Sequence, residues 1–255
     1  MENVLKIENL KYKSILNNVT FSLSPKSFNI LIGSNGSGKT TLVNSIRGIL
    51  DYEGKIEVCD KNILENYKEI GFFIDDEIFL ENIAFNELTN LLVNLGYEEE
   101  FAKKKVYEVS KKIDASYILF KKKEALFKFE NTLISFIFSI IHNPKLLIID
   151  NDLEELNEKY KNKIFEYLKK QKKMTVLFIT NNSEYFYMAE NFLILNNGTI
   201  TDILNFEELV KEEKKLLKNG SNLPFAIELS NKLISYELLN SRETDLEKMV
   251  NEIWK

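Results

Sequence analysis

The sequence is poor in the residues that form disulfides, metal clusters and rigid turns. It contains one cysteine, one histidine, three prolines and nine glycines among 255 residues. Because Cys59 has no second cysteine to pair with, an internal disulfide is excluded and a reducing compartment is favoured. The most apolar segment, residues 133–141, is much shorter than the roughly 20 residues that a transmembrane helix needs. The first residues show no basic stretch followed by an apolar core, so we expect no signal peptide.

A basic excess is also missing. The formal net charge is −5 and the isoelectric point is about 5.3, which argues against nucleic acid as a partner because phosphate backbones attract basic surfaces. Hydrophobic residues make up 44% of the chain and charged residues 29%, as in ordinary globular proteins. The length allows one large domain, or a domain with a small addition, around a substantial core.

Short apolar runs typical of strands alternate with longer segments of helical periodicity, which predicts an α/β protein with a parallel-sheet core. A hairpin is predicted over 192–203, with an Asn-Gly turn. A Lys-rich amphipathic helix is predicted over 157–173, and residues 80–142 are mainly helical in pattern. The predicted strands are 4–8, 19–24, 28–32, 55–59, 70–74, 146–150 and 175–180.

The segment GSNGSGKT, residues 33–40, carries the most specific motif in the sequence. It matches G-x-x-x-x-G-K-[ST], and it lies between a predicted buried strand and a predicted helix that begins at Thr41, the context of a phosphate-binding loop. Its glycines let consecutive backbone N–H groups point at one anion, and the helix adds its positive end. The predicted nucleotide-binding residues are Gly33, Ser34, Asn35, Gly36, Ser37, Gly38, Lys39, Thr40 and Thr41.

A phosphate-binding loop of this kind works with Mg²⁺, and two residues are predicted to hold that ion. The Thr40 hydroxyl is a direct ligand in the motif, while Lys39 places a positive charge between the β- and γ-phosphates. Asp150 closes the apolar run 146–150 and is suited to hold Mg²⁺ through water. The alternative for Asp150 is a helix N-cap, and the two roles are compatible.

At this point the chain resembles the ATP-binding subunits of ABC transporters. The resemblance rests on residues 33–40, 143–150, 175–180 and 193–200, in the order and approximate spacing of that family. The segments LPFAIELSNKLISYELL (223–239) and DLEKMVNEIWK (245–255) further resemble the C-terminal part of the ATPases of energy-coupling factor (ECF) importers. The resemblance implies a nucleotide-binding domain over 1–205 and a C-terminal helical extension over 206–255. The domain would combine the parallel core with an antiparallel β subdomain and an inserted helical subdomain at about 80–142.

The family resemblance also implies cofactors, partners and a location. Two ABC ATPase subunits would sandwich ATP and Mg²⁺ while docked on an integral membrane transport subunit at the cytoplasmic face of the cell membrane. We expect a heterodimer, because this chain lacks parts that each subunit of a homodimer would need. Tyr12 is a candidate to stack on the adenine; the alternative is that it belongs to the core.

Several positions depart from the family pattern. Asn151 stands where a glutamate polarises the attacking water, and Asn181 stands where a histidine holds the γ-phosphate. Asp75 takes the place of a glutamine that links the site to the membrane subunit. No glycine occurs between Gly96 and Gly198, so the LSGGQ-like signature loop is replaced by LFKFE, residues 126–130.

These departures predict binding of ATP and Mg²⁺ with little or no hydrolysis. Asn151 cannot accept a proton, and loss of a general base lowers a rate by about 10²–10⁴. Loss of a positioned donor, as at Asn181, lowers it by about 10²–10³. Lys128 could instead supply a charge to the partner's phosphate, or simply lie in solvent. His142 is interpreted as a helix-end residue.

Other functions stay open at this stage. One is a slow ATPase that its partner subunit activates, and another is an ATP-binding scaffold or regulator without a role in transport. A third is the ATPase of a peptide exporter or immunity pump, which would share the phosphate-binding loop but not the 223–239 segment. The sequence says nothing of the transported solute, whether vitamin, metal or other small molecule.

Overall fold

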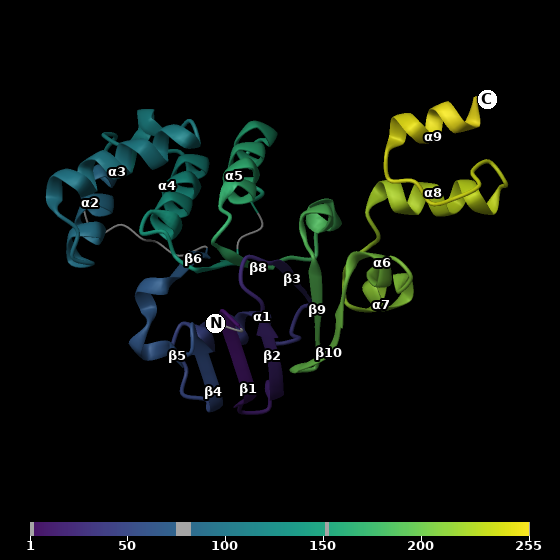
Figure 1. Cartoon of the computed structure of the whole chain (residues 1–255), viewed down its shortest axis with the longest axis horizontal. Helices are drawn as coiled ribbons and strands as arrows, with labels where there is room; N and C mark the ends of the chain where they lie inside the picture. Colours follow the sequence, from purple (N-terminus) through teal and green to yellow (C-terminus); the bar gives the residue numbers. More distant parts are fainter. Residues whose placement is uncertain (1–2, 75–82, 151–152, 255) are drawn as a thin grey trace.

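The computed structural model describes residues 3–74, 83–150 and 153–254. Among them, the strands form two sheets, one of six strands and one of four. The six-stranded sheet lies across the middle of the molecule, with helices on one side and the four-stranded sheet on the other (Figure 1). This layered arrangement of helices on a mostly parallel sheet confirms the predicted α/β fold.

The six-stranded sheet has the order β10-β9-β3-β8-β7-β6. Every neighbouring pair is parallel except β9 and β10. Side chains of the central strands alternate between two cores, so that Ile30 and Ile32 face one and Leu31 faces the other. Burial on both faces explains why these strands are continuous apolar runs in the sequence. The strands are β3 (Phe28–Ile32), β6 (Ile70–Ile74), β7 (Leu146–Asp150), β8 (Thr175–Ile179), β9 (Asn191–Asn196) and β10 (Thr199–Leu204).

The β9–β10 hairpin is confirmed, with a two-residue turn. Asn197 and Gly198 have φ angles of 47° and 73°, as a type I′ turn requires. Gly198 also has a packing reason, because a Cβ atom there would lie 2.0 Å from the carbonyl oxygen of Ile15. The hairpin turn is therefore pressed against the loop between the first two strands of the chain.

The four-stranded antiparallel sheet has the order β2-β1-β4-β5. Helix α1 (Lys39–Ile46) lies between it and the six-stranded sheet, and buried apolar side chains from all three form one core. The predicted strand 19–24 overlaps β2, which begins three residues earlier and ends one residue earlier. The strands are β1 (Leu5–Tyr12), β2 (Leu16–Leu23), β4 (Glu53–Val58) and β5 (Lys61–Asn62).

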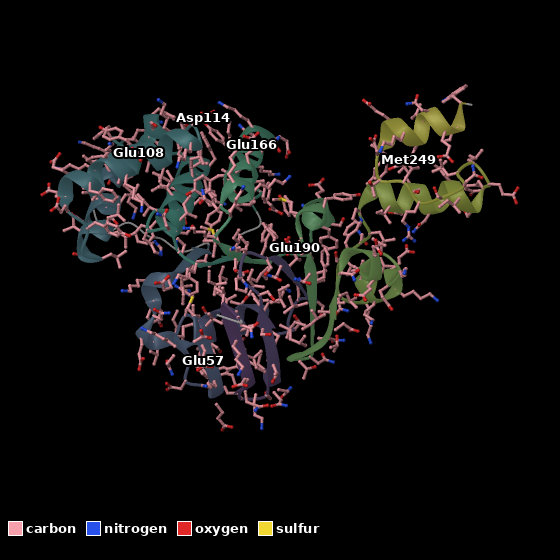
Figure 2. The ribbon with its side chains drawn as sticks, viewed as in Figure 1. Glu57, Glu108, Asp114, Glu166, Glu190 and Met249 are labelled. Atoms are coloured by element: carbon pink, nitrogen blue, oxygen red, sulfur yellow. The ribbon has the colours of Figure 1, made fainter. Side chains whose placement is uncertain are left out.

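On the other face of the six-stranded sheet lies a layer of helices (Figure 1). The apolar segment 133–141 forms the second part of α4 and its C-cap residue. Its large apolar side chains other than the half-buried Phe138 are fully buried, so its composition reflects deep packing. Gly71 of β6 permits this packing, because a Cβ atom there would lie 1.9 Å from the carbonyl oxygen of Ser139. The helices are α2 (Ala84–Asn94), α3 (Glu99–Lys112), α4 (Lys128–Ile140) and α5 (Glu158–Lys170). Asp114, labelled in Figure 2, follows α3 and forms ion pairs of 3.8 and 3.9 Å with Lys159 and Lys163 of α5.

The chain after β10 is helical. Helices α6 (Phe206–Leu209) and α7 (Glu213–Lys218) lie beside the hairpin, and α8 (Phe225–Ser235) and α9 (Leu246–Ile253) project away from the sheets (Figure 1). Met249, labelled in Figure 2, is 1% exposed and joins α9 to α8 in a small core of their own. Within the described residues, every helix is too short or too polar to cross a lipid bilayer.

Candidate functional site

The phosphate-binding loop follows β3 and leads into α1, as the sequence predicts. Gly36 and Gly38 have φ angles of 80° and 107°, in the left-handed region that favours glycine. A Cβ atom at Gly36 would touch nothing within 4 Å, so this residue is needed for backbone shape and leaves open space above the loop. At Gly38 a Cβ atom would lie 2.9 Å from the Cδ2 atom of Leu16, so this glycine also permits close packing.

The loop presents N–H groups suited to an anion. Among the residues that the structure describes, the N–H groups of Asn35, Gly36 and Gly38 have no hydrogen-bond acceptor. The first turn of α1, which begins at Lys39, contributes further N–H groups without intrahelical acceptors, together with the positive end of the helix dipole. A triphosphate would satisfy these donors, so the loop fits the group that the motif predicts.

Lys39 crosses this loop. Its ammonium group donates hydrogen bonds to the carbonyl oxygens of Gly33 and Ser34, the second at 3.0 Å. The lysine therefore neutralises the partial charge of two carbonyls at the start of the loop. Phosphate oxygens carry full negative charge and are stronger acceptors for an ammonium group than peptide carbonyls are.

The two predicted metal ligands lie at the same edge of the six-stranded sheet as the loop. Thr40 is in the first turn of α1, directly after the loop. Asp150 is the last residue of β7, and β7 is parallel to β8, which is parallel to β3. The carboxyl ends of these strands therefore meet at one edge, where ligands bind in open α/β sheets. A hydroxyl and a carboxylate are hard oxygen donors that suit Mg²⁺ once phosphate oxygens and water complete its octahedron.

Asn181 also lies at this edge, two residues after β8. Its Oδ1 atom accepts a hydrogen bond from the Gly33 N–H at 3.1 Å, and its Nδ2 atom donates one to the Gly33 carbonyl at 2.9 Å. The side-chain amide thus pairs with both polar groups of one residue in the loop. We call this the Asn181–Gly33 pair. Sequence reasoning placed Asn181 near the γ-phosphate and missed this contact, because a side-chain bond over 148 positions leaves no local signal.

Tyr12 is the last residue of β1. It packs partly against the core, with the Lys13 ammonium 5.0 Å from its ring centre. In the same turn, the carbonyl oxygen of Ile15 would lie 3.4 Å from a Cβ atom on Gly38, and its side chain is 40% exposed. Ile15 therefore borders the phosphate-binding loop together with Leu16, and the sequence did not single it out. An adenine contact of Tyr12 stays a prediction.

Two positions predicted to differ from the family, Asp75 and Asn151, lie outside the described residues. The replaced signature segment does lie within them. It leads into α4, where Phe127 precedes the first helical residue and is 66% exposed. The ring of Phe127 stacks on that of Phe129, with 6.0 Å between centres and 9° between planes.

The N-terminal end of α4 is occupied by a side chain of its own helix. The Glu130 carboxylate accepts a hydrogen bond from the Phe127 N–H at 3.1 Å and pairs with Lys121 at 2.7 Å. Burial raises the pKa of Glu130, but its bonds to the Lys121 ammonium and the Phe127 N–H outweigh this effect and hold the pKa below its usual value. Lys128, at the first position of α4, is largely exposed and pairs with Glu155.

His142 is far from this site. Its Nε2 atom is 3.0 Å from the carbonyl oxygen of Ile70, the first residue of β6. Burial is the main reason that its pKa lies below the usual value, with the Ile70 carbonyl opposing this effect. Because β6 is parallel to the strands that carry the site, its first residue lies at the opposite edge of the sheet. This position agrees with the interpretation of His142 as a residue at the end of α4.

Comparisons with known proteins agree with this geometry. The family model described as "ABC transporter" matches residues 16–154, more than half of the chain. The energy-coupling factor transporter ATP-binding protein EcfA of Pediococcus pentosaceus is 25% identical, and the match covers 99% of each chain. EcfA2 of Caldanaerobacter subterraneus subsp. tengcongensis is 29% identical, with 91% of this chain and 88% of the relative covered.

Solved structures show the same fold. A structure of an ATP-binding subunit of an ABC transporter superposes with a TM-score of 0.74 at 17% identity, covering 99% of this chain and all of the other. CbiO1 of Clostridium perfringens, part of the ABC transporter complex cbiONQ, gives a TM-score of 0.73 at 20% identity, over 93% and 99% of the two chains. Fold and loop together define a P-loop nucleoside triphosphatase fold with a phosphate-binding site. Within that class, the chain belongs to the ABC transporter family of ATP-binding proteins.

Proposed function

We propose that this protein is the ATP-binding subunit of an ECF-like ABC importer and that it holds ATP and Mg²⁺ with little or no hydrolysis. The observation that carries the proposal is the formed phosphate-binding loop beside an asparagine, Asn181, that pairs with the loop itself. The relatives named as ECF transporter ATP-binding proteins support the transporter class, because they match nearly the whole chain, including the C-terminal extension.

Binding is derived from the loop and α1. The N–H groups of residues 35, 36 and 38, which have no acceptor in the described part of the chain, are available to an anion, and the exposed position of Gly36 leaves room for it. On nucleotide binding, the Lys39 ammonium group donates hydrogen bonds to phosphate oxygens in place of the carbonyls of Gly33 and Ser34. Thr40 and Asp150 would hold Mg²⁺, which would neutralise phosphate charge. Tyr12 stacks on the adenine in this proposal.

Hydrolysis requires groups that this chain does not supply. An amide at position 151 can orient water but cannot remove its proton, and the amide of Asn181 is engaged with Gly33. To donate to a γ-phosphate, Asn181 would have to give up at least one of its two bonds to the loop. Both effects slow turnover relative to an ATPase with a glutamate and a histidine at these positions, by about 10²–10⁴ for the missing base alone.

The same reasoning extends to the nucleotide of a second subunit. The N-terminal end of α4 is closed by Glu130, whose carboxylate would repel a phosphate, and Phe127 offers no hydroxyl. Lys128 is a cation at this end of the helix, and a phosphate would have to compete with its pairing to Glu155. A complete pair of sites is hard to build from two copies of such a chain, which supports a heterodimer with another ABC ATPase.

The proposed assembly places this subunit at the cytoplasmic face of the membrane. It would dock there, with its ATPase partner, on an integral membrane transport subunit that recognises a vitamin, metal or other small solute. Residues 1–205 form the nucleotide-binding domain in this proposal, with the helical subdomain at about 80–142. Residues 206–255 form the C-terminal extension, as in the ECF ATPases that the chain resembles.

Titration calorimetry with Mg-ATP tests the binding step. The wild-type chain should show saturable binding, and Lys39→Ala should weaken it about 10- to 150-fold, since a hydrogen bond to a charged group contributes about 1.5–3 kcal/mol. Lys26→Ala is a control for the loss of a lysine, because Lys26 precedes β3 at the end of the strand away from the loop. Absence of saturable binding by the wild-type chain would refute the proposal.

The rate of ATP hydrolysis distinguishes this function from the second candidate, a slow ATPase. The intact phosphate-binding loop is the observation that favours that candidate. Phosphate release by the wild-type chain should equal that of the Lys39→Ala variant. This should hold for the chain alone. It should also hold for the chain in complex with its co-expressed partner ATPase, when the lysine of the partner's phosphate-binding loop has been substituted to disable the partner. A rate clearly above that level, abolished by Lys39→Ala, would favour the slow ATPase.

A further inference from the structure

The turn after α7 lies against the phosphate-binding loop, although it is about 180 positions away in the sequence. Gly220 is at this turn, with a φ angle of 77°. A Cβ atom on Gly220 would lie 3.4 Å from the Nδ2 atom of Asn181 and 3.8 Å from the Cα atom of Ser34. Asn219 and Ser221 on either side are buried, with 2% and 3% of their surface exposed. This turn of the C-terminal extension therefore packs against Asn181 and Ser34 at the nucleotide site.

Hydrogen bonds fix this turn to the segment after β8 that contains Asn181. The Ser221 hydroxyl donates to the backbone carbonyl of Asn181 at 2.7 Å. Two residues further along each segment, the Ser183 hydroxyl donates to the carbonyl of Leu223 at 3.3 Å. Within the turn, the Ser221 N–H donates to the carbonyl of Leu216 at 3.0 Å, which ties the turn to α7.

Both the backbone and the side chain of Asn181 are thus held by hydrogen bonds. Its backbone carbonyl is bonded to Ser221 of the extension, and its side-chain amide is bonded to both polar groups of Gly33. The Gly33 carbonyl also accepts the Lys39 ammonium. A continuous series of contacts therefore leads from the extension to the lysine that would bind phosphate.

We propose that Ser221 is a positioning residue of the nucleotide site, which acts through Asn181 on Gly33, and that nucleotide binding in turn changes the 219–223 segment. This inference rests on the proposed function only for the binding of Mg-ATP. It assigns a role to the C-terminal extension within its own subunit, in addition to whatever surface the extension offers to other chains.

The physical reason is the change that phosphate imposes on Lys39. In the structure its ammonium group holds the carbonyls of Gly33 and Ser34. When phosphate oxygens take the ammonium group, these carbonyls lose a donor, and the Asn181–Gly33 pair becomes the main contact that fixes the start of the loop. Because Gly220 packs against Asn181 and Ser34, a movement of either residue reaches the turn. Coupling of this kind is reciprocal, so a change in the turn must alter nucleotide affinity.

The first experiment measures nucleotide affinity. Ser221→Ala removes the hydroxyl that holds the Asn181 carbonyl and should raise the Kd for Mg-ATP about 3- to 10-fold, the range that corresponds to one hydrogen bond. Ser110→Ala is the matched control, because the Ser110 hydroxyl is also buried and also donates to a backbone carbonyl at 2.7 Å, within α3. This control should change the Kd less than twofold.

A double-mutant cycle distinguishes positioning from general stabilisation. Asn181→Ala removes both bonds to Gly33 and should raise the Kd more than Ser221→Ala does. If Ser221 acts through the Asn181 side chain, Ser221→Ala should have no further effect on Kd in the Asn181→Ala background. A purely structural role would lower the unfolding temperature of both variants and leave equal effects in both backgrounds, or no effect on Kd at all. Either of these results would overturn the proposal.

The second experiment uses the wild-type chain, so it does not depend on whether a variant folds. Hydrogen–deuterium exchange of peptides that cover residues 213–254, which include α9, is measured with and without saturating Mg-ATP. The amides of 219–223 should change their exchange on nucleotide addition, whereas those of α9 should not. Unchanged exchange at 219–223 in the saturated protein would overturn the coupling. If no nucleotide binds at all, the proposed function fails. If nucleotide binds but exchange at 219–223 does not change, only the further inference fails.

Discussion

The ion pair between Lys121 and Glu130 gives a prediction whose size can be worked from the structure. The side chain of Glu130 is 2% exposed and that of Lys121 is 32% exposed, and their atoms are 2.7 Å apart. Lys121→Met keeps the apolar length of the side chain and removes its charge. The Glu130 carboxylate is then left buried, with the Phe127 N–H and the Tyr117 hydroxyl as partners that still stabilise its charge.

The expected loss of stability is about 2–3 kcal/mol, below the 3–5 kcal/mol typical of a fully buried pair because Lys121 is partly exposed. With an unfolding entropy of about 2.1 cal/mol/K per residue, this corresponds to a decrease of roughly 4–6 °C in the unfolding temperature. Lys103→Met is the matched control, since Lys103 pairs with Glu99 and Glu100 on the exposed face of α3. Surface pairs of that kind contribute about 0–1 kcal/mol.

The effect must also depend on pH in a defined direction. In the wild type the pKa of Glu130 is lowered, so its contribution to stability is present above the pKa of an unfolded glutamate and is lost as pH falls through the folded value. In Lys121→Met burial is no longer opposed by the ammonium, so the pKa of Glu130 should rise. Thermal unfolding should therefore show a larger difference between variant and wild type at pH 8 than at pH 5. A loss no larger than that of Lys103→Met, or one independent of pH between these values, would refute this reasoning.

Three further predictions concern nucleotide chemistry and packing. Lys39→Arg should restore part of the Mg-ATP affinity that Lys39→Ala loses, measured by calorimetry, because the charge is kept but the guanidinium is planar and larger. Asn151→Glu should increase phosphate release over the wild type, and an unchanged rate would show that a missing base is not the limiting defect. Gly71→Ala should lower the free energy of unfolding by about 3 kcal/mol, since its Cβ would lie 1.9 Å from the Ser139 carbonyl oxygen, whereas Gly96→Ala, with open space and a φ of 93°, should cost about 1 kcal/mol.

Much of the central sheet and of the phosphate-binding loop could be predicted from the sequence. The strands around Ile30 and Ile148 are buried on both faces, and this forces continuous apolar runs that are visible without a structure. The loop is likewise a local feature, because Gly36 and Gly38 must adopt left-handed backbone angles within the motif itself. The predicted ends of elements were less accurate, since β2 begins at Leu16 and the sequence predicted a start at residue 19.

The burial of 133–141 shows a different limit of sequence reasoning. Its composition allowed either deep packing or an exposed contact surface, since both need apolar side chains. In the structure the segment is packed in the core. Gly71 makes this possible, because its lack of a side chain lets α4 approach β6 closely. That fit depends on two segments far apart in the chain, so neither segment contains the answer alone.

The sequence by itself determined the class of fold, through the alternation of strand and helix patterns along the chain, and the phosphate-binding loop, through residue type within one short segment. Only the tertiary structure decided what Asn181 and Ser221 contact. Hydrogen bonds depend on the position of a few atoms to within about half an ångström. Positions of that kind are set by packing of the whole chain, which brings residues 33, 181 and 221 together at one edge of the sheet.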